Sequence, residues 1–280
     1  MTTSKLLIAG TIICIAVYLF ATAPPELTDR GAAGGASDTV ATARLFNVAN
    51  SINDAARLVY TKRIVGGGSA AGLKFGEDWA EPGVDEGPLP ALFLRLVAGR
   101  METKPEPLGL YLGSDQPINK SNHFSDDQLT QFLAVKTQRA PSFGQTTTGF
   151  LVAMYPDFAS AQPCVDCHNE HPDSPKTDWR LGDVMGATTW TYPSKAVSAS
   201  ELLAVSTAVL AAVEESYQAY LDKTQSFTSP VVIGADWPAK DIQTLPDAPT
   251  FMAEVREVAA IRVMEALVTT TLPEQEQRKL

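Results

Sequence analysis

The sequence predicts an α+β protein with an antiparallel sheet flanked by helices, one N-terminal transmembrane helix and a helical C-terminal extension. Apolar residues recur at helical spacing in several segments and alternate with a period of two in a few short ones. Near the N-terminus they form one uninterrupted run. The chain has 280 residues, of which 45% are hydrophobic. That is enough for one large folded domain or two modest ones.

The uninterrupted apolar run covers residues 6–23 and carries no charge. It just spans a bilayer, since about 20 apolar residues cross the hydrocarbon. A cleaved signal peptide is the alternative, although Pro24 would hinder cleavage after the small residues before it. Lys5 puts the N-terminus on the cytoplasmic side. We therefore expect residues 1–24 to anchor the chain in the lipid bilayer of the inner membrane, residues 25–39 to form a linker, and the body to lie in the periplasm.

Three helices and three strands are predicted in the main domain, residues 40–193. The helices cover residues 45–64, ending at the glycines 66–68; residues 90–100; and a segment that begins at the capping box of Ser125 and Gln128. The strands cover residues 108–112, 147–155 and 185–192. Phe150, Val152 and Met154 should share one side of the second strand.

Residues 194–280 read as a helical C-terminal extension. A capping box at Ser198 and Glu201 begins a long apolar helix, and a second helix is predicted over residues 251–269. Neither carries a catalytic motif. Their apolar faces exceed what a small domain needs, which predicts a protein interface. Removing both helices should then leave the main domain intact.

Cys164, Cys167 and His168 form the motif C-x-x-C-H, which is the attachment signature of c-type haem. Two thiols three positions apart can add to the two vinyl groups of one porphyrin, and the histidine that follows can then ligate the iron. The motif predicts one covalent haem c, with His168 as the proximal ligand. The predicted strands on either side place the motif in a loop.

Two other interpretations of the motif are weaker. A structural zinc site needs two more ligands, and His171 lies too close to His168 to complete a relaxed tetrahedron. A disulfide between Cys164 and Cys167 suits an oxidising compartment but leaves the adjacent histidine unexplained.

Three segments carry a family resemblance: residues 164–186 (CVDCHNEHPDSPKTDWRLGDVMG), 59–66 (VYTKRIVG) and 89–99 (LPALFLRLVAG). They resemble the c-type haem-binding PAS-like sensor domain, the extracytoplasmic input domain of bacterial histidine kinases and nucleotide cyclases, catalogued as a domain of unknown function. The resemblance covers roughly residues 40–193. It implies a PAS-like antiparallel sheet with flanking helices and a haem held against the sheet.

The residues after the motif suit contacts with a haem. Lys176 and Arg180 can neutralise propionates, Arg180 in a bidentate manner. Trp179 can pack against a haem edge and donate a hydrogen bond through its indole N–H. A surface loop with a half-buried tryptophan is the simpler alternative. His171 is expected to hydrogen-bond near the site rather than to reach the opposite haem face.

The sixth iron ligand decides between functions and is left open. His123, Met101 and Met154 are the candidate donors, whereas Cys14 lies in the membrane run. Tyr60 is a possible hydrogen-bond donor on the distal side. A filled position gives an electron carrier, and an open one gives a gas sensor or a peroxidase-like centre. A peroxidase-like centre needs an acid–base pair beside the iron, which the few histidines do not readily supply, so we do not expect an enzyme.

The net charge of −10 argues against nucleic acid as a partner. No kinase, cyclase or other output motif is found in the sequence. We therefore expect a monohaem cytochrome that serves electron transfer within a membrane complex of the respiratory or photosynthetic type, bound to a redox partner protein. A haem-based gas or redox sensor acting through a partner protein is the alternative.

Overall fold

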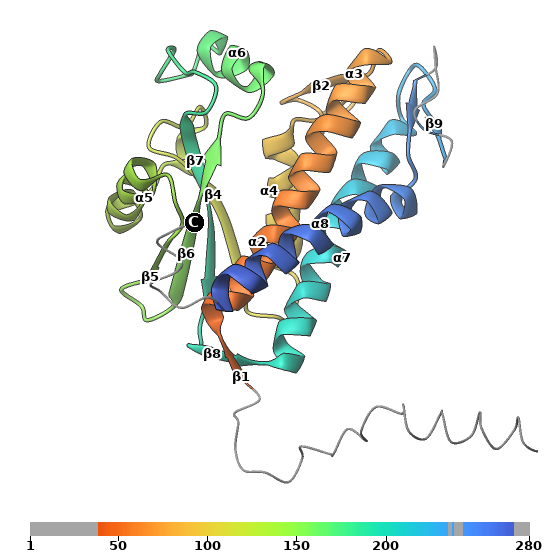
Figure 1. Cartoon of the computed structure of the whole chain (residues 1–280). Helices are drawn as coiled ribbons and strands as arrows, with labels where there is room; N and C mark the ends of the chain where they lie inside the picture. The colour runs from red at the N-terminus through yellow and green to blue at the C-terminus, as the bar shows by residue number, and fades with distance from the viewer. Residues whose placement is uncertain (1–38, 235–236, 238–242, 272–280) are drawn as a thin grey trace, which may run out of the picture. The chain divides into compact units, whose positions relative to one another are not determined.

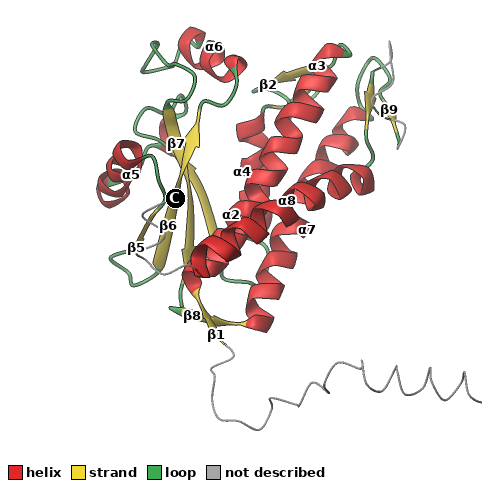
Figure 2. Cartoon of the chain, viewed as in Figure 1, coloured by secondary structure: helices red, strands yellow, loops and turns green. Residues whose placement is uncertain are grey.

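A four-stranded antiparallel sheet and a group of long helices make up the computed structural model, which describes residues 39–234, 237 and 243–271 (Figures 1 and 2). The α+β class is therefore confirmed. The expected membrane run and almost all of the linker lie outside the described residues. Among the helices that are described, none is both long and apolar enough to cross a membrane.

The main sheet has the strand order β4-β7-β6-β5, with every neighbouring pair antiparallel. The strands are β4 (Gly109–Gly113), β5 (Ser142–Gln145), β6 (Leu151–Phe158) and β7 (Val184–Tyr192). Two of the three predicted strands are confirmed. The strand predicted over residues 147–155 is β6, which begins at Leu151 rather than at residue 147. Thr146 and Gly149 form the turn between β5 and β6. Gly149 adopts a φ of 90° there, which favours glycine.

Three short strand pairs complete the sheet structure of the described residues. They are β1 (Thr39–Ala41) with β8 (Ala196–Ser198), which is antiparallel, and two parallel pairs, β2 (Lys74–Gly76) with β3 (Glu86–Pro88) and β9 (Val232–Ile233) with β10 (Thr244–Leu245).

The first helix does not end at its glycines, so that prediction is wrong. α2 (Thr42–Val59) continues as the π-helix η2 (Tyr60–Gly67) and the short α3 (Gly68–Ala70). A Cβ on Gly68 would lie only 3.1 Å from the side chains of Leu73 and Phe75. The glycine thus allows close packing, and burial of Tyr60 and Ile64 offsets the roughly 1 kcal/mol that a helical glycine costs.

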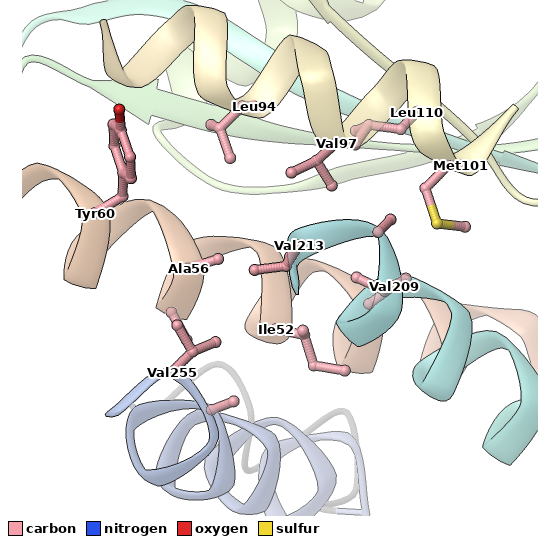
Figure 3. Packing of buried hydrophobic residues seen from close by; sticks show 14 of the residues in the cluster. Ile52, Ala56, Tyr60, Leu94, Val97, Met101, Leu110, Val209, Val213 and Val255 are labelled. Atoms are coloured by element: carbon pink, nitrogen blue, oxygen red, sulfur yellow. The ribbon is translucent and has the colours of Figure 1, made fainter. Parts of the chain in front are cut away.

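Four helices form the main core on one face of the sheet: α2, α4 (Pro90–Met101), α7 (Ala199–Thr224) and α8 (Ala248–Thr271) (Figure 3). The predicted capping box at the start of α7 is present. Val209 and Val213 of α7 pack in the same cluster as Val97 and Ile52. The apolar face of α7 is therefore core, and the expectation that it is spare surface is wrong.

α8 divides its apolar residues between two sides. Phe251, Met252 and Val255 are buried against the core. Ile261, Met264 and Val268, on another side of the helix, are exposed.

α5 (Asp126–Gln138) covers the opposite face of the sheet, and its predicted capping box is present. Phe132 and Val135 pack there with Met154, whereas the neighbouring Ala153 belongs to the main core. The predicted alternation along β6 is therefore confirmed for these residues. A 3₁₀ turn, η3 (Lys120–Asn122), precedes α5.

Candidate functional site

The C-x-x-C-H motif lies on a helix, α6 (Gln162–Glu170), between β6 and β7 (Figure 1). The expected order along the chain is confirmed, but the expectation of a loop is wrong. Pro163 in the first turn suits a helix start, and Gln162 donates to Asp166 at 2.6 Å one turn later. The helical spacing puts the Cys164 and Cys167 side chains on neighbouring positions of one face. Both are free thiols.

The string after the motif folds back onto α6. The Asn169 side chain accepts a hydrogen bond from the Trp179 backbone N–H at 2.8 Å and donates to the Trp179 carbonyl at 3.0 Å. Trp179 packs with Val165 and Met185 in a small cluster of its own, and its ring meets the His168 ring edge-on at 6.3 Å. This loop therefore fixes a buried tryptophan beside the expected iron ligand.

A cleft of about 470 Å³ opens in front of His168. Its walls come from α4, from β4 and the segment after it, from β7 and from α6. The residues that line it include Glu77, Arg95, Asn122, Asp157, Cys167, His168 and Met185. The volume is within the range of about 300–1,000 Å³ that is usual for ligand pockets.

Arg95 is the cation of this cleft, and sequence reasoning missed it. Its guanidinium faces the Asn122 side-chain amide and forms no ion pair with any carboxylate in the described part of the chain. Burial lowers the pKa of Arg95, with Tyr111 and Glu77 opposing that shift. A signal existed in the sequence, since Arg95 is the charged residue inside the otherwise apolar stretch 90–99.

The environment of His168 favours the neutral imidazole. Burial lowers its pKa, His171 adds to this shift and Glu77 opposes it. Neutral imidazole is the form that binds a metal. His171 accepts a hydrogen bond from the Asp173 backbone at 3.1 Å, and its Nε2 lies 3.6 Å from a Glu77 carboxylate oxygen.

The two other residues expected to contact haem propionates lie on the loop that follows α6. Lys176 lies over the Trp179 ring at 4.6 Å and pairs with Asp178, whereas Arg180 is exposed beside the same loop. Neither lines the cleft described above.

The structure does not bring the candidate distal residues to the cleft. Met101 and Met154 are buried in the two cores, and Tyr60 is buried with its hydroxyl donating to the Pro88 carbonyl at 2.7 Å. His123 is exposed, with its Nδ1 2.8 Å from the Phe124 carbonyl. The thioether that does line the cleft belongs to Met185, which sequence reasoning had not selected.

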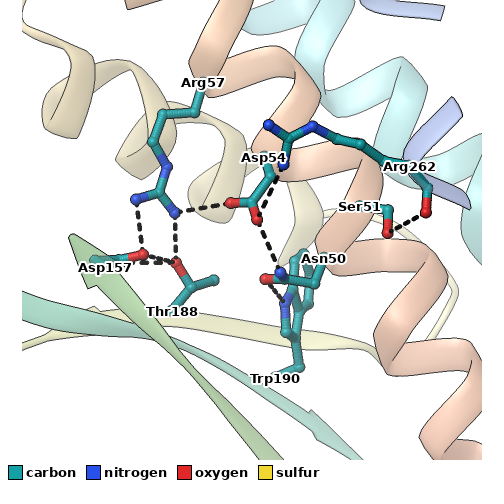
Figure 4. A network of polar contacts seen from close by, with 8 residues as sticks. All are labelled: Asn50, Ser51, Asp54, Arg57, Asp157, Thr188, Trp190 and Arg262. Carbon is teal, nitrogen blue, oxygen red and sulfur yellow. Dashed lines mark hydrogen bonds and ion pairs between the residues drawn. The ribbon is translucent and has the colours of Figure 1, made fainter. Parts of the chain in front are cut away.

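A charged cluster adjoins the cleft and was also missed (Figure 4). Arg57 of α2 lies 2.7 Å from Asp157 of β6 and 3.2 Å from Asp54 of its own helix. Asp157 reaches Arg57 only through packing of α2 on the sheet, so the local spacing of Asp54 and Arg57 does not by itself reveal the cluster.

The chemistry of the cleft fits a c-type haem. Nδ1 of His168 and the indole nitrogen of Trp179 are among the buried polar atoms that have no hydrogen-bond partner in the described residues. Within these residues no three His, Cys, Asp or Glu side chains gather as a metal-binding group. A haem requires only one or two protein ligands, because the porphyrin supplies the equatorial nitrogens. The free thiols, one histidine and an unpaired arginine are a matching set.

Comparison with known proteins gives one match. The family model described as Tll0287-like matches residues 39–193, which is more than half of the chain. No curated protein and no solved structure matches the sequence.

Proposed function

The chain belongs to the Tll0287-like family, and we propose that it is an extracytoplasmic monohaem c-type cytochrome that passes single electrons to and from a partner protein. The observation that carries this proposal is the motif on α6, whose histidine and second cysteine line a cleft of ligand size. A PAS-like description of the sheet, an inner-membrane anchor at residues 6–23 and a place in a membrane complex belong to the same proposal.

Cys164 and Cys167 are the attachment residues in this proposal. They lie on one side of a helix that is itself held by Val165 in the cluster with Trp179. Burial raises the pKa of Cys167, with smaller contributions from Glu77, Cys164 and Glu170. A protonated thiol is the less reactive form, so Cys167 resists oxidation before haem is attached.

His168 would hold the iron, which supplies one-electron redox chemistry when bound. Trp179 limits the rotation of the imidazole by edge-on contact at 6.3 Å. Arg95 would bind a propionate, because a half-buried guanidinium without a carboxylate partner among the described residues favours an added anion. Exposure of Cys167 leaves one edge of the site open to a partner protein.

Attachment is tested by expressing the full chain together with a haem c maturation system. The wild type and an Asp166→Ala control should retain haem stain on a denaturing gel, since Asp166 is an exposed spacer position of the motif. Cys164→Ala/Cys167→Ala should lose the stain completely. His168→Ala should keep it while changing the absorption spectrum. Stain that survives the double substitution contradicts the proposal.

A gas sensor is the second candidate, and a specific observation favours it. None of the expected sixth ligands, His123, Met101 and Met154, lines the cleft, which favours an open iron site and therefore a sensor. Met185 is the thioether that does line the cleft, so it is the residue to test as a sixth ligand. Reduced spectra with and without carbon monoxide separate the two functions. Resistance to carbon monoxide that is lost in Met185→Ala supports a six-coordinate electron carrier. Binding of carbon monoxide by the wild type supports the sensor.

A further inference from the structure

The charged cluster of Asp54, Arg57 and Asp157 connects the cleft to the helices (Figure 4). Asp157 lines the cleft and pairs with Arg57 at 2.7 Å. Arg57 donates to the Thr188 hydroxyl at 2.9 Å, and that hydroxyl donates to Asp157 at 3.0 Å. The cluster is therefore rigidly tied to one wall of the cleft.

The cluster holds more negative than positive charge in its interior. Asp54 and Asp157 share Arg57, the cation that bridges them. The second cation, Arg262 of α8, lies 3.8 Å from Asp54 with 38% of its side chain exposed, so solvent screens it. Asn50 donates to Asp54 at 3.1 Å, and Tyr155 of β6 also interacts with the Asp54 charge.

Asp54 is the group of the cluster that is prepared to bind a proton. Burial raises its pKa, Arg57 lowers it, Asp157 raises it and Arg262 lowers it, with a net upward shift. One third of its side-chain surface remains exposed, which gives protons a route from solvent.

The same cluster is close to the expected haem. Asp157 lines the cleft together with His168 and pairs with Arg57. An electron added in the cleft therefore increases the negative potential at the cluster. A carboxylate that already shares its cation then binds a proton more tightly.

We propose that Asp54 takes up a proton from solvent when a one-electron donor protein reduces the haem, and releases it on oxidation. One electron enters the cleft, and one O–H bond forms at the Asp54 carboxyl; no other bond changes. Asp157 and Arg57 act as positioning residues that couple the two events. This inference rests on the proposed function.

The test is the midpoint potential of the full-length haem protein between pH 5 and 9. For the wild type we expect a potential that falls with rising pH, by at most about 59 mV for each tenfold drop in proton concentration. Asp54→Asn should remove this slope. Asp127→Asn, an exposed carboxyl on α5, should keep it.

A second measurement covers the case in which Asp54→Asn does not fold. The reduced-minus-oxidised infrared spectrum of the wild type should contain the band of a protonated carboxyl, shifted by ¹³C-labelled aspartate. A wild-type potential independent of pH, an unchanged slope in Asp54→Asn, or no such band overturns the inference while the cytochrome proposal stands. A purified protein without haem absorption overturns both.

Discussion

The helical core and the region around α6 both bury aromatic side chains, but α6 alone of the two carries the C-x-x-C-H motif. In the core, Tyr60 stacks on Phe93 at 4.1 Å and Tyr217 stacks on Phe251 at 4.0 Å, and both tyrosine hydroxyls donate to backbone carbonyls. Around α6, His168 and Trp179 each leave a buried nitrogen without a partner in the described part of the chain. The core also holds buried polar atoms without a partner in the described residues, among them the Tyr220 hydroxyl and the Asn53 amide, but the α6 region in addition borders a cleft of ligand size lined by Cys167 and His168.

This contrast indicates that the α6 cleft, and not the helical core, is the region to test for function. The aromatic residues of the core contribute packing, whereas the motif that the sequence singles out borders the cleft. The cleft combines the free thiol of Cys167, an arginine without an ion pair among the described residues and a histidine whose pKa is lowered by burial. Unsatisfied polar groups cost free energy in a folded protein, so they tend to be retained where a ligand repays that cost.

Truncation after Tyr192 is the change with the largest expected effect on the comparison. It removes α7 and α8, which bury Val209, Val213 and Met252 in the core shared with α2. We expect the truncated chain to lose cooperative unfolding, as followed by circular dichroism. A chain ending at Thr271, which keeps every described helix, is the control. A folded truncated protein would show that the sheet and α6 are stable without the helical core.

Phe93→Ala tests the core directly. Phe93 is fully buried and stacks on Tyr60, so its loss should lower the free energy of unfolding by about 3–5 kcal/mol. Leu203→Ala, at a position 69% exposed, should change it by less than about 0.5 kcal/mol. Denaturant titration of the two variants measures both. Similar values for the two would contradict the described packing of α4.

Arg95→Gln tests the cleft. If Arg95 binds a propionate, its loss should reduce the free energy of unfolding of the haem-loaded protein by about 1.5–3 kcal/mol, the usual contribution of a hydrogen bond to a charged group. Arg100→Gln, an exposed position on the same helix, should have little effect. The haem-free Cys164→Ala/Cys167→Ala protein should not respond to Arg95→Gln. An equal loss with and without haem would assign Arg95 to structure alone.

The smallest effect is expected in the pH dependence of stability. The raised pKa of Asp54 means that the folded state binds this proton more tightly than the unfolded state does. Its contribution is full below the ordinary pKa of 3.8 and is lost as pH rises through the higher folded value. Asp54→Asn should therefore show a smaller decrease in unfolding free energy on going from pH 4 to neutral pH. Identical pH profiles would indicate an unshifted carboxyl.

Local patterns in the sequence were sufficient to predict many of the helices and strands of this protein. The capping boxes at Ser125 and Ser198 begin helices as predicted, because a cap depends on residues within one turn of each other. The strands predicted over residues 108–112 and 185–192 are present as β4 and β7. The spacing of Cys164, Cys167 and His168 likewise carries its chemical hypothesis without any knowledge of the fold.

Only the tertiary structure decided the features that depend on distant neighbours. The helix runs through the glycines at 66–68, and at Gly68 the missing Cβ allows Leu73 and Phe75 to pack closely. Met101 and Met154 are sequestered in separate cores, whereas Met185 lines the cleft. The pairing of Arg57 with Asp157 joins residues 100 positions apart in the printed sequence. Such contacts follow from how helices and sheet pack on one another, and the spacing of residues along the chain does not encode them.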